Sequence, residues 1–251
     1  MDRNTLYVSD LDGTLLQNDA TLSPYAREEL NRMMDEGLQF TVSSARSTGT
    51  IIDILKARYA DAPCALHYKK DYELMIAVRL SAQCTDARVN IVTKDLFKKY
   101  KTVEDFANAD YDELCEDIRS TGFYRNKAKN IIAAAQRMID VYNGEVPDTM
   151  EDLLTLPGTG RKTANLVLGD IYKKPAIVVD THCIRLSNRT GLTKNSDPVK
   201  IESDLRKIIA PEESLGFCHR LVAHGRAVCN ARKPMCDGCV LDGVCKKVGV
   251  K

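Results

Sequence analysis

The chain has 251 residues, of which 44% are hydrophobic and 28% charged, and its formal net charge is +1. This length and composition exclude a disulfide-stapled mini-protein, a fibrous protein and a disordered chain. No apolar run reaches the ~18 residues of a membrane-spanning helix, and the acidic start lacks the pattern of a secretory signal. We therefore expect a cytoplasmic globular protein with no membrane partner.

The first 50 residues differ in composition from the rest of the chain. They contain no lysine and no cysteine, and they carry four arginines against eight acids, whereas the remainder carries 32 basic and 27 acidic residues. Apolar residues 6–8, a helical run over 24–36 and a second apolar run over 38–42 after Gly37 predict strand, helix and strand. Residues 1–50 are therefore predicted to form a short βαβ fragment.

From residue 51 onward the hydrophobic pattern has the helical period of about 3.6 residues. In the first helix Leu74, Ala77, Val78, Ser81 and Cys84 are expected to share one face. Helices are predicted near 71–84, 87–100, 125–143, 161–171, 180–190, 198–208 and 213–227. No repeat or low-complexity linker interrupts them, so the fold class is mainly α with short connections.

Residues 152–171 are predicted to form two helices joined by a turn that contains Pro157, Gly158 and Gly160. Two glycines allow positive φ and let backbone N–H groups converge at a helix N-terminus, so that such a helix-hairpin-helix can hold a phosphate. A tight turn between two core helices is the alternative that this pattern leaves open.

Two side chains after the turn are candidates for catalysis. Lys162 lies in the first turn of the second helix, where N–H dipoles disfavour a cation, so helix stability does not explain it. A lysine that is partly neutral near pH 7 is a nucleophile of the Schiff-base type. The apolar run 176–179 ends in Asp180, whose carboxylate can stabilise a developing positive charge or cap the next helix.

Four cysteines lie close together near the carboxyl end. Cys229, Cys236, Cys239 and Cys245 provide four soft ligands within 17 residues, enough for a tetrahedral zinc ion or a 4Fe-4S cluster. The total of nine cysteines is odd, which argues against a disulfide framework, while the spacing leaves the metal open. The other cysteines are expected to be small core residues; they are Cys64, Cys84, Cys115, Cys183 and Cys218.

The segments LPGTGRKTANLVLG and PAIVVDTHCIRLSNR resemble the endonuclease III family of helix-hairpin-helix DNA glycosylases. The resemblance runs from about residue 52 to residue 247. It implies a two-lobed fold in which 71–180 form a six-helix domain with the hairpin, while 51–70 and 181–251 form a domain that carries a 4Fe-4S cluster on the four cysteines. The positions of Lys162 and Asp180 are catalytic in that family.

Two further segments extend this resemblance to DNA contacts. The family pattern LLSAQxTD corresponds to Arg79-Leu80-Ser81-Ala82-Gln83-Cys84-Thr85-Asp86, in which the glutamine enters the space left by the everted nucleotide. A leucine wedge is usual where this chain has Phe123, and an aromatic ring can also stack in a base step.

Basic and glycine residues complete the expected DNA-binding set. Arg232 and Lys233, between the first two cysteines of the loop, are predicted to bind phosphate, as are Gly158 and Gly160 of the hairpin. For Arg232 and Lys233, a solvated charge pair is the alternative.

The amino-terminal fragment carries a second resemblance. Residues 7–15, YVSDLDGTL, resemble the first motif of the haloacid dehalogenase superfamily, in which the first aspartate accepts a phosphoryl group and the second is a general acid beside magnesium. Asp10 and Asp12 correspond to these residues. The resemblance ends by residue 50, before the later lysine and acidic pair that a working member needs, so we predict an inactive, truncated fragment.

The resemblance therefore implies a bifunctional enzyme of base excision repair that acts as a monomer on double-stranded DNA. It would remove oxidised pyrimidines and cut the abasic site through a lysine Schiff base and β-elimination. A magnesium-dependent phosphatase that uses the amino-terminal motif is one alternative, and phosphate release that persists without Lys162 would favour it. A non-catalytic DNA-binding module is the other, and tight binding to abasic DNA without cutting would favour that.

Overall fold

The computed structural model describes residues 5–10, 14–15, 22–43 and 46–250. The chain clusters into two compact units, Met1–Ile54 and Leu55–Lys251. Across the described ranges, no helix is both long and apolar enough to cross a membrane.

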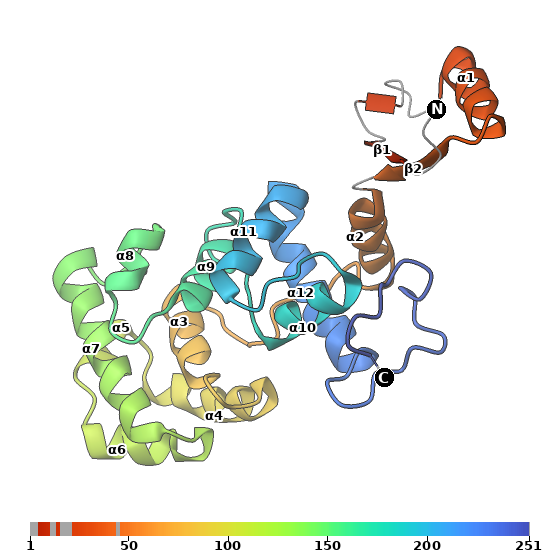
Figure 1. Ribbon diagram of the computed structural model, residues 1–251. Helices are drawn as coiled ribbons and strands as arrows, with labels where there is room; N and C mark the ends of the chain where they lie inside the picture. The colour runs from red at the N-terminus through yellow and green to blue at the C-terminus, as the bar shows by residue number, and fades with distance from the viewer. Residues whose placement is uncertain (1–4, 11–13, 16–21, 44–45, 251) are drawn as a thin grey trace. The chain divides into compact units, whose positions relative to one another are not determined.

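The first unit has the predicted strand, helix and strand (Figure 1). Strands β1 (Leu6–Asp10) and β2 (Gln39–Ser43) are parallel, and α1 (Pro24–Asp35) connects them. Ser23 caps α1 by accepting a hydrogen bond from the N–H of Ala26 at 3.1 Å. Because α1 has no buried residue, the unit encloses little core. Asp10 ends β1, whereas Asp12 lies outside the described residues.

Helix α2 (Arg46–Arg58) was not predicted and spans both sides of the expected boundary at residue 50. Its first turns contain serine, threonine and glycine, which are weak helix formers and hide the helix in the sequence pattern. The two units meet inside this helix, between Ile54 and Leu55.

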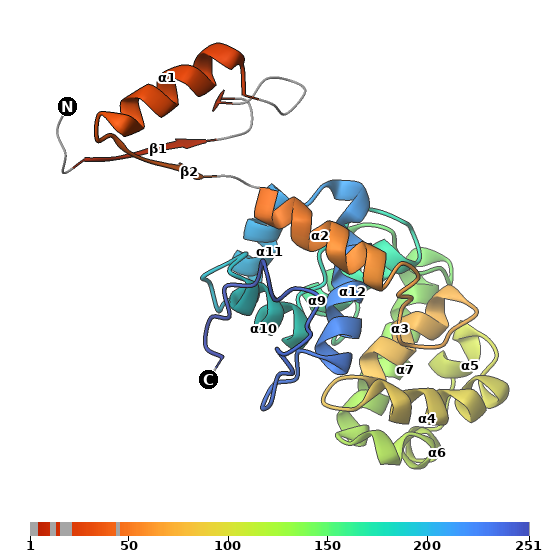
Figure 2. The same ribbon diagram turned by 90° about the vertical axis from the view of Figure 1, so that its right-hand side faces the viewer.

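The described residues of the second unit form helices and loops but no strand, and the segment after Ala227 is a loop (Figures 1 and 2). Its α-helices after α2 are α3 (Asp71–Leu80), α4 (Asp86–Lys99), α5 (Val103–Ala107), α6 (Tyr111–Asp117), α7 (Tyr124–Tyr142), α8 (Met150–Thr155), α9 (Arg161–Asp170), α10 (Thr181–Thr190), α11 (Pro198–Ile208) and α12 (Ser214–Ala227). The predicted helices are confirmed, whereas the short α5 and α6 were missed. The division into two lobes at residues 180 and 181 stays a prediction.

Helix α3 forms the centre of this unit. Every residue from Tyr72 to Leu80 is buried, so the helix is covered on all sides and not only on the predicted face. It packs against α4, α7 and α9. The helix ends at Leu80 instead of residue 84, because Ser81 caps it and Gln83 adopts a left-handed conformation.

Helix α9 joins two groups of helices, because it packs against α3 and α8 on one side and against α12 on the other. Helix α12 in turn packs against α10. The first turn of α9 and the first turn of α10 therefore lie close to the loop that follows α3, which places the candidate site.

Candidate active site

An open cleft of about 660 Å³ lies where the loop after α3, the start of α9 and the start of α10 meet. Lys162 and Asp180 both line this cleft, and both also line a narrower recess of about 70 Å³ that adjoins it. Ser81 and Asp86 are likewise shared by the two cavities. The structure thus brings the lysine and the aspartate to one cavity from the ends of two different helices.

The hairpin between α8 and α9 has one glycine with a positive φ. Gly158 has a φ of +70°, and the N–H of Thr159 donates to the carbonyl of Leu156 at 3.0 Å, which closes the turn. Gly160 is the N-cap of α9 with a φ of −103°, so the positive φ expected of both glycines occurs only at Gly158. The cap provides no side-chain acceptor, which leaves the first N–H groups of α9 available to an anion.

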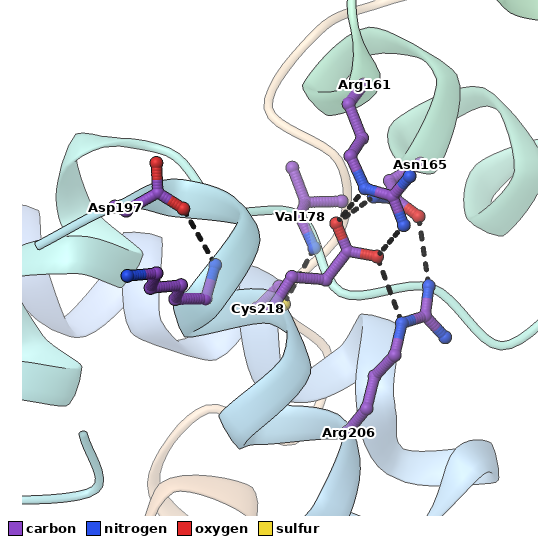
Figure 3. Close-up of polar contacts among 8 residues, drawn as sticks. Arg161, Asn165, Val178, Asp197, Arg206 and Cys218 are labelled. Carbon is purple, nitrogen blue, oxygen red and sulfur yellow. Dashed lines mark hydrogen bonds and ion pairs between the residues drawn. The ribbon is translucent and has the colours of Figure 1, made fainter. Parts of the chain in front are cut away.

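The arginine that precedes Lys162 is held in an ion-pair network (Figure 3). Arg161 donates from Nε and Nη2 to the buried carboxylate of Glu202 at 2.6 and 2.9 Å. Arg206 and Asn165 donate to the same carboxylate at 3.0 and 3.1 Å. Burial raises the pKa of Glu202, but the hydrogen bonds from the two arginines outweigh it and lower that pKa. The network ties the first turn of α9 to α11.

Asp180 caps α10 and lines the cleft at the same time. Its Oδ1 accepts a hydrogen bond from the N–H of Cys183 at 2.7 Å. The four residues before it, 176–179, are buried, so the half-buried carboxylate stands at the end of an anchored segment. The two roles weighed from the sequence are therefore compatible, because the cap uses one oxygen.

Gln83 and Phe123 share an unusual backbone conformation. Their φ values are +53° and +50°, in the left-handed region that side chains other than glycine rarely adopt. Gln83 is exposed and lines the cleft. Phe123 is 67% exposed at the N-cap of α7. Such strain tends to persist at functional sites, where it points a side chain outward.

The rim of the cleft carries charged residues that sequence reasoning did not assign. Asp86 forms an ion pair with Arg226, and Arg185 Nη2 lies 3.1 Å from His182 Nδ1. Burial lowers the pKa of His182, which favours its neutral form. Asp86 ends the motif that contains Gln83, and His182 lies two residues after Asp180 in its motif, a signal that was available, whereas nothing local marks Arg226.

The adjoining recess is lined by His219, which contacts the buried Asp170, a pair that the sequence did not predict. His219 Nε2 lies 3.1 Å from Asp170 Oδ1, and both residues are largely buried. Burial, followed by the nearby charge of Asp170, raises the pKa of Cys64 to about 12. Cys64 and Cys84 are half-buried and line the recess and the cleft respectively, so the expectation that they are core residues was wrong.

The four cysteines of the carboxy-terminal loop line one small cavity. All are free and half-buried. Arg189 Nη1 donates to the sulfur of Cys229 at 3.2 Å, and the sulfur of Cys239 lies 3.5 Å from His224 Nε2. Burial raises the pKa of Cys239, and the other three thiols add to this by like-charge repulsion. A positively charged metal centre bound in this cavity would relieve that repulsion.

The arrangement of the four cysteines bears on which metal centre the loop could bind. In the part of the chain that the structure describes, no three His, Cys, Asp or Glu side chains converge as ligands of a single ion. A 4Fe-4S cluster instead places each thiolate at its own iron, around the sides of a shared cavity. The arrangement of four thiols around one cavity fits that donor set. Arg232 and Lys233 are exposed in the same loop, and their role stays a prediction.

Two family models match the sequence. Residues 76–211 match the HhH-GPD superfamily of base excision DNA repair proteins. Residues 7–66 match the haloacid dehalogenase-like hydrolases, a range that continues past residue 50, where the resemblance was expected to end.

Curated relatives and solved structures agree with the first match. Endonuclease III of Synechocystis is 47% identical over 84% of this chain and 97% of its own length. Endonuclease III of Bacillus subtilis is 44% identical over 78% of this chain and 90% of its own. The solved structure of a trapped endonuclease III-DNA covalent intermediate has a TM-score of 0.79 and 44% identity, covering 82% of this chain and 97% of that one.

Proposed function

Because the chain belongs to the endonuclease III family of base excision repair DNA glycosylases, we propose that it removes oxidised pyrimidines from duplex DNA and cuts the resulting abasic site. The observation that carries the proposal is the shared cavity of Lys162 and Asp180. An amine and a carboxylate that face one cleft are what a Schiff-base glycosylase requires.

Lys162 is the proposed nucleophile. Its Nζ lone pair attacks the sugar C1′, the bond from C1′ to the base breaks, and the base leaves with that electron pair and takes up a proton. The attached Nζ then loses a proton, the bond from C1′ to O4′ breaks as O4′ takes up a proton, and the nitrogen lone pair forms an iminium ion between Lys162 and C1′. Loss of a C2′ proton forms a double bond between C2′ and C3′ and expels the 3′ phosphate, which nicks the strand. Water finally hydrolyses the imine and releases the lysine.

Asp180 is proposed to assist that reaction electrostatically. As the glycosidic bond breaks, positive charge develops on the sugar, and a fixed carboxylate stabilises it. The hydrogen bond from the N–H of Cys183 and the buried segment behind Asp180 hold the carboxylate in place, so little reorganisation is needed. Asp180 can also accept the proton that Lys162 must lose before it attacks.

DNA binding is proposed to use the exposed residues around the cleft. Gln83 fills the gap left by the everted nucleotide, and Phe123 stacks in the opened base step, since both side chains are exposed on left-handed residues. The N–H groups of the hairpin and the basic pair Arg232 and Lys233 bind phosphate. These residues belong to one chain, so a monomer suffices.

The cofactor is proposed to be a 4Fe-4S cluster on Cys229, Cys236, Cys239 and Cys245. The four thiols line one cavity, as its ligands must. When bound, the cluster would hold the loop in place and with it Arg232 and Lys233, which lie between its first two ligands. The residues of the cleft carry out the reaction. The haloacid dehalogenase-like fragment is proposed to play no part in it.

Borohydride trapping tests the proposal. The protein is incubated with duplexes that carry thymine glycol, uracil or an abasic site. Nicking is measured without sodium borohydride, and covalent adducts are measured in parallel reactions that contain it. We expect nicking and an adduct on thymine glycol and on the abasic site. Lys162→Gln should abolish both while binding to abasic DNA remains.

Lys200→Gln is the matched control, because Lys200 is also an exposed lysine in the first turn of a helix, α11. It should trap at the wild-type rate. Asp180→Asn should slow base release by roughly 10² or more and still trap on a preformed abasic site. Trapping of Lys162→Gln at the wild-type rate would show that another amine is the nucleophile.

A further inference from the structure

Arg79 is a buried cation without a carboxylate partner. Its side chain is at the end of α3 and the residue is 7% exposed. Among the described residues, the one hydrogen-bond partner of its guanidinium is Thr159 in the hairpin turn, whose Oγ1 accepts from Nη2 at 3.0 Å. The family pattern given above has leucine at this position, so the charge is a departure of this chain.

The guanidinium of Arg79 lies directly against the hairpin turn. A Cβ atom built on Gly158 would lie 1.7 Å from Nη1 and 2.9 Å from Cζ of Arg79, so the space that a side chain would need is filled by the cation. The only fully buried side-chain N or O atom without a partner in the described ranges belongs to Asp170. The remaining N–H groups of Arg79 are therefore not sealed from solvent.

Arg220, by comparison, is a buried arginine that has a carboxylate partner. It is buried to the same extent, 8% exposed, and its Nη1 lies 2.8 Å from the carboxylate of Glu213. Arg79 has no such partner, and burial alone lowers its pKa to about 10, so it remains charged at neutral pH. The negative end of the α3 dipole offsets only part of the cost of burying that charge.

We propose that Arg79 is the countercharge for a DNA phosphate bound at the 156–160 hairpin. A phosphate on the N–H groups at the start of α9 would lie beside Gly158, whose bare backbone keeps the guanidinium close to it. Arg79 thereby adds a cationic contact to a turn that otherwise offers only backbone dipoles. The inference rests on the proposed DNA binding and names one contact within it.

Salt-dependent binding tests this inference. Affinity for a duplex with a tetrahydrofuran abasic analogue is measured over a range of KCl concentrations for the wild type, Arg79→Met, Arg79→Gln and Arg79→Lys. Both neutral variants should bind roughly tenfold more weakly at low salt, and the slope of log K against log salt should decrease in magnitude by about 0.9. Arg79→Lys should keep the wild-type slope.

Two further measurements separate this contact from a packing role. Arg79→Met should raise Tm by about 2 °C or more, because it removes an unpaired buried charge. Lys98→Met, which removes an exposed charge on α4, should leave the slope unchanged. A wild-type slope in both neutral variants would overturn the inference about Arg79 alone, whereas a wild-type protein that does not bind the duplex would overturn the proposed function.

Discussion

Glu202→Gln is expected to destabilise the second unit and to slow catalysis, although Glu202 does not line the cleft. Oε2 accepts from Arg161 and Asn165, and Oε1 accepts from Arg161 and Arg206. Glutamine would keep one acceptor oxygen and place an NH₂ group where the other was. That group would face two hydrogen-bond donors and lose both bonds.

The expected loss in free energy of unfolding follows from how far the Glu202 ion pairs are buried. Removing one partner of a fully buried ion pair costs about 3–5 kcal/mol. The side chains of Arg161 and Arg206 are 46% and 40% exposed, so solvent screens the two charges that Glu202 leaves behind. We therefore expect a loss of about 2 kcal/mol, which for a unit of this size lowers Tm by roughly 4–8 °C.

The loss should depend on pH. Glu202 has a folded-state pKa below its ordinary value of 4.5, so its contribution is fully present above pH 4.5 and disappears as pH falls through the folded-state pKa. The difference between wild type and Glu202→Gln should therefore be constant near pH 7 and shrink below about pH 4.5. The nicking rate should also fall, roughly tenfold, because Lys162 follows Arg161 in a helical turn that is no longer fixed.

Thermal unfolding by circular dichroism and single-turnover nicking measure the two effects. Asp95→Asn is the control, because Asp95 pairs with Lys98 on the exposed face of α4 and should change neither quantity measurably. The reasoning is refuted if Glu202→Gln has the wild-type Tm at pH 7. A lower Tm with an unchanged nicking rate would show that the network does not position Lys162.

Three other perturbations have expected outcomes. Cys236→Ser or Cys239→Ser should lose iron, sulfide and visible absorption, since ligand binding and loop folding are coupled; wild-type protein with equimolar zinc and no iron would contradict the cluster. Deletion of residues 1–45, which spares α2, should change nicking by no more than a few-fold, as should Asp10→Asn, and a hundredfold loss would show that the fragment is needed. Phe123→Ala should weaken binding to lesion DNA by tenfold or more, about 1–3 kcal/mol, with Tm unchanged because the ring is exposed; unchanged affinity would argue against stacking.

The helices that the sequence predicted well are those whose signals are local. The helical run over 24–36 predicts α1, and the apolar period sets the extent of α4, α7 and α11. The same is true of Lys162 and Asp180, since their motifs lie at helix starts that the structure reproduces. Local signals were sufficient to place these two residues at the starts of their helices, and their catalytic roles stay predictions.

The features that the sequence did not reveal depend on residues far apart in the chain. Glu202 and Arg161 are separated by 41 positions, and Arg79 and Thr159 by 80. The left-handed conformations of Gln83 and Phe123 also escaped prediction, because neither is glycine or asparagine, the residues that usually mark such a turn.

The proposed DNA-binding residues carry unfavourable local features, whereas the Glu202 network stabilises the start of α9. Left-handed Gln83 and Phe123 cost about 1–2 kcal/mol each, and the start of α9 has no side-chain cap. The ion pair between Arg161 and Glu202 of α11 stabilises the first turn of α9. Because a bound duplex would satisfy the uncapped N–H groups, these contacts would contribute to its affinity, and DNA should stabilise the native state by an amount that this affinity and the DNA concentration set. The free enzyme therefore retains unsatisfied groups at the positions where a duplex is expected to bind.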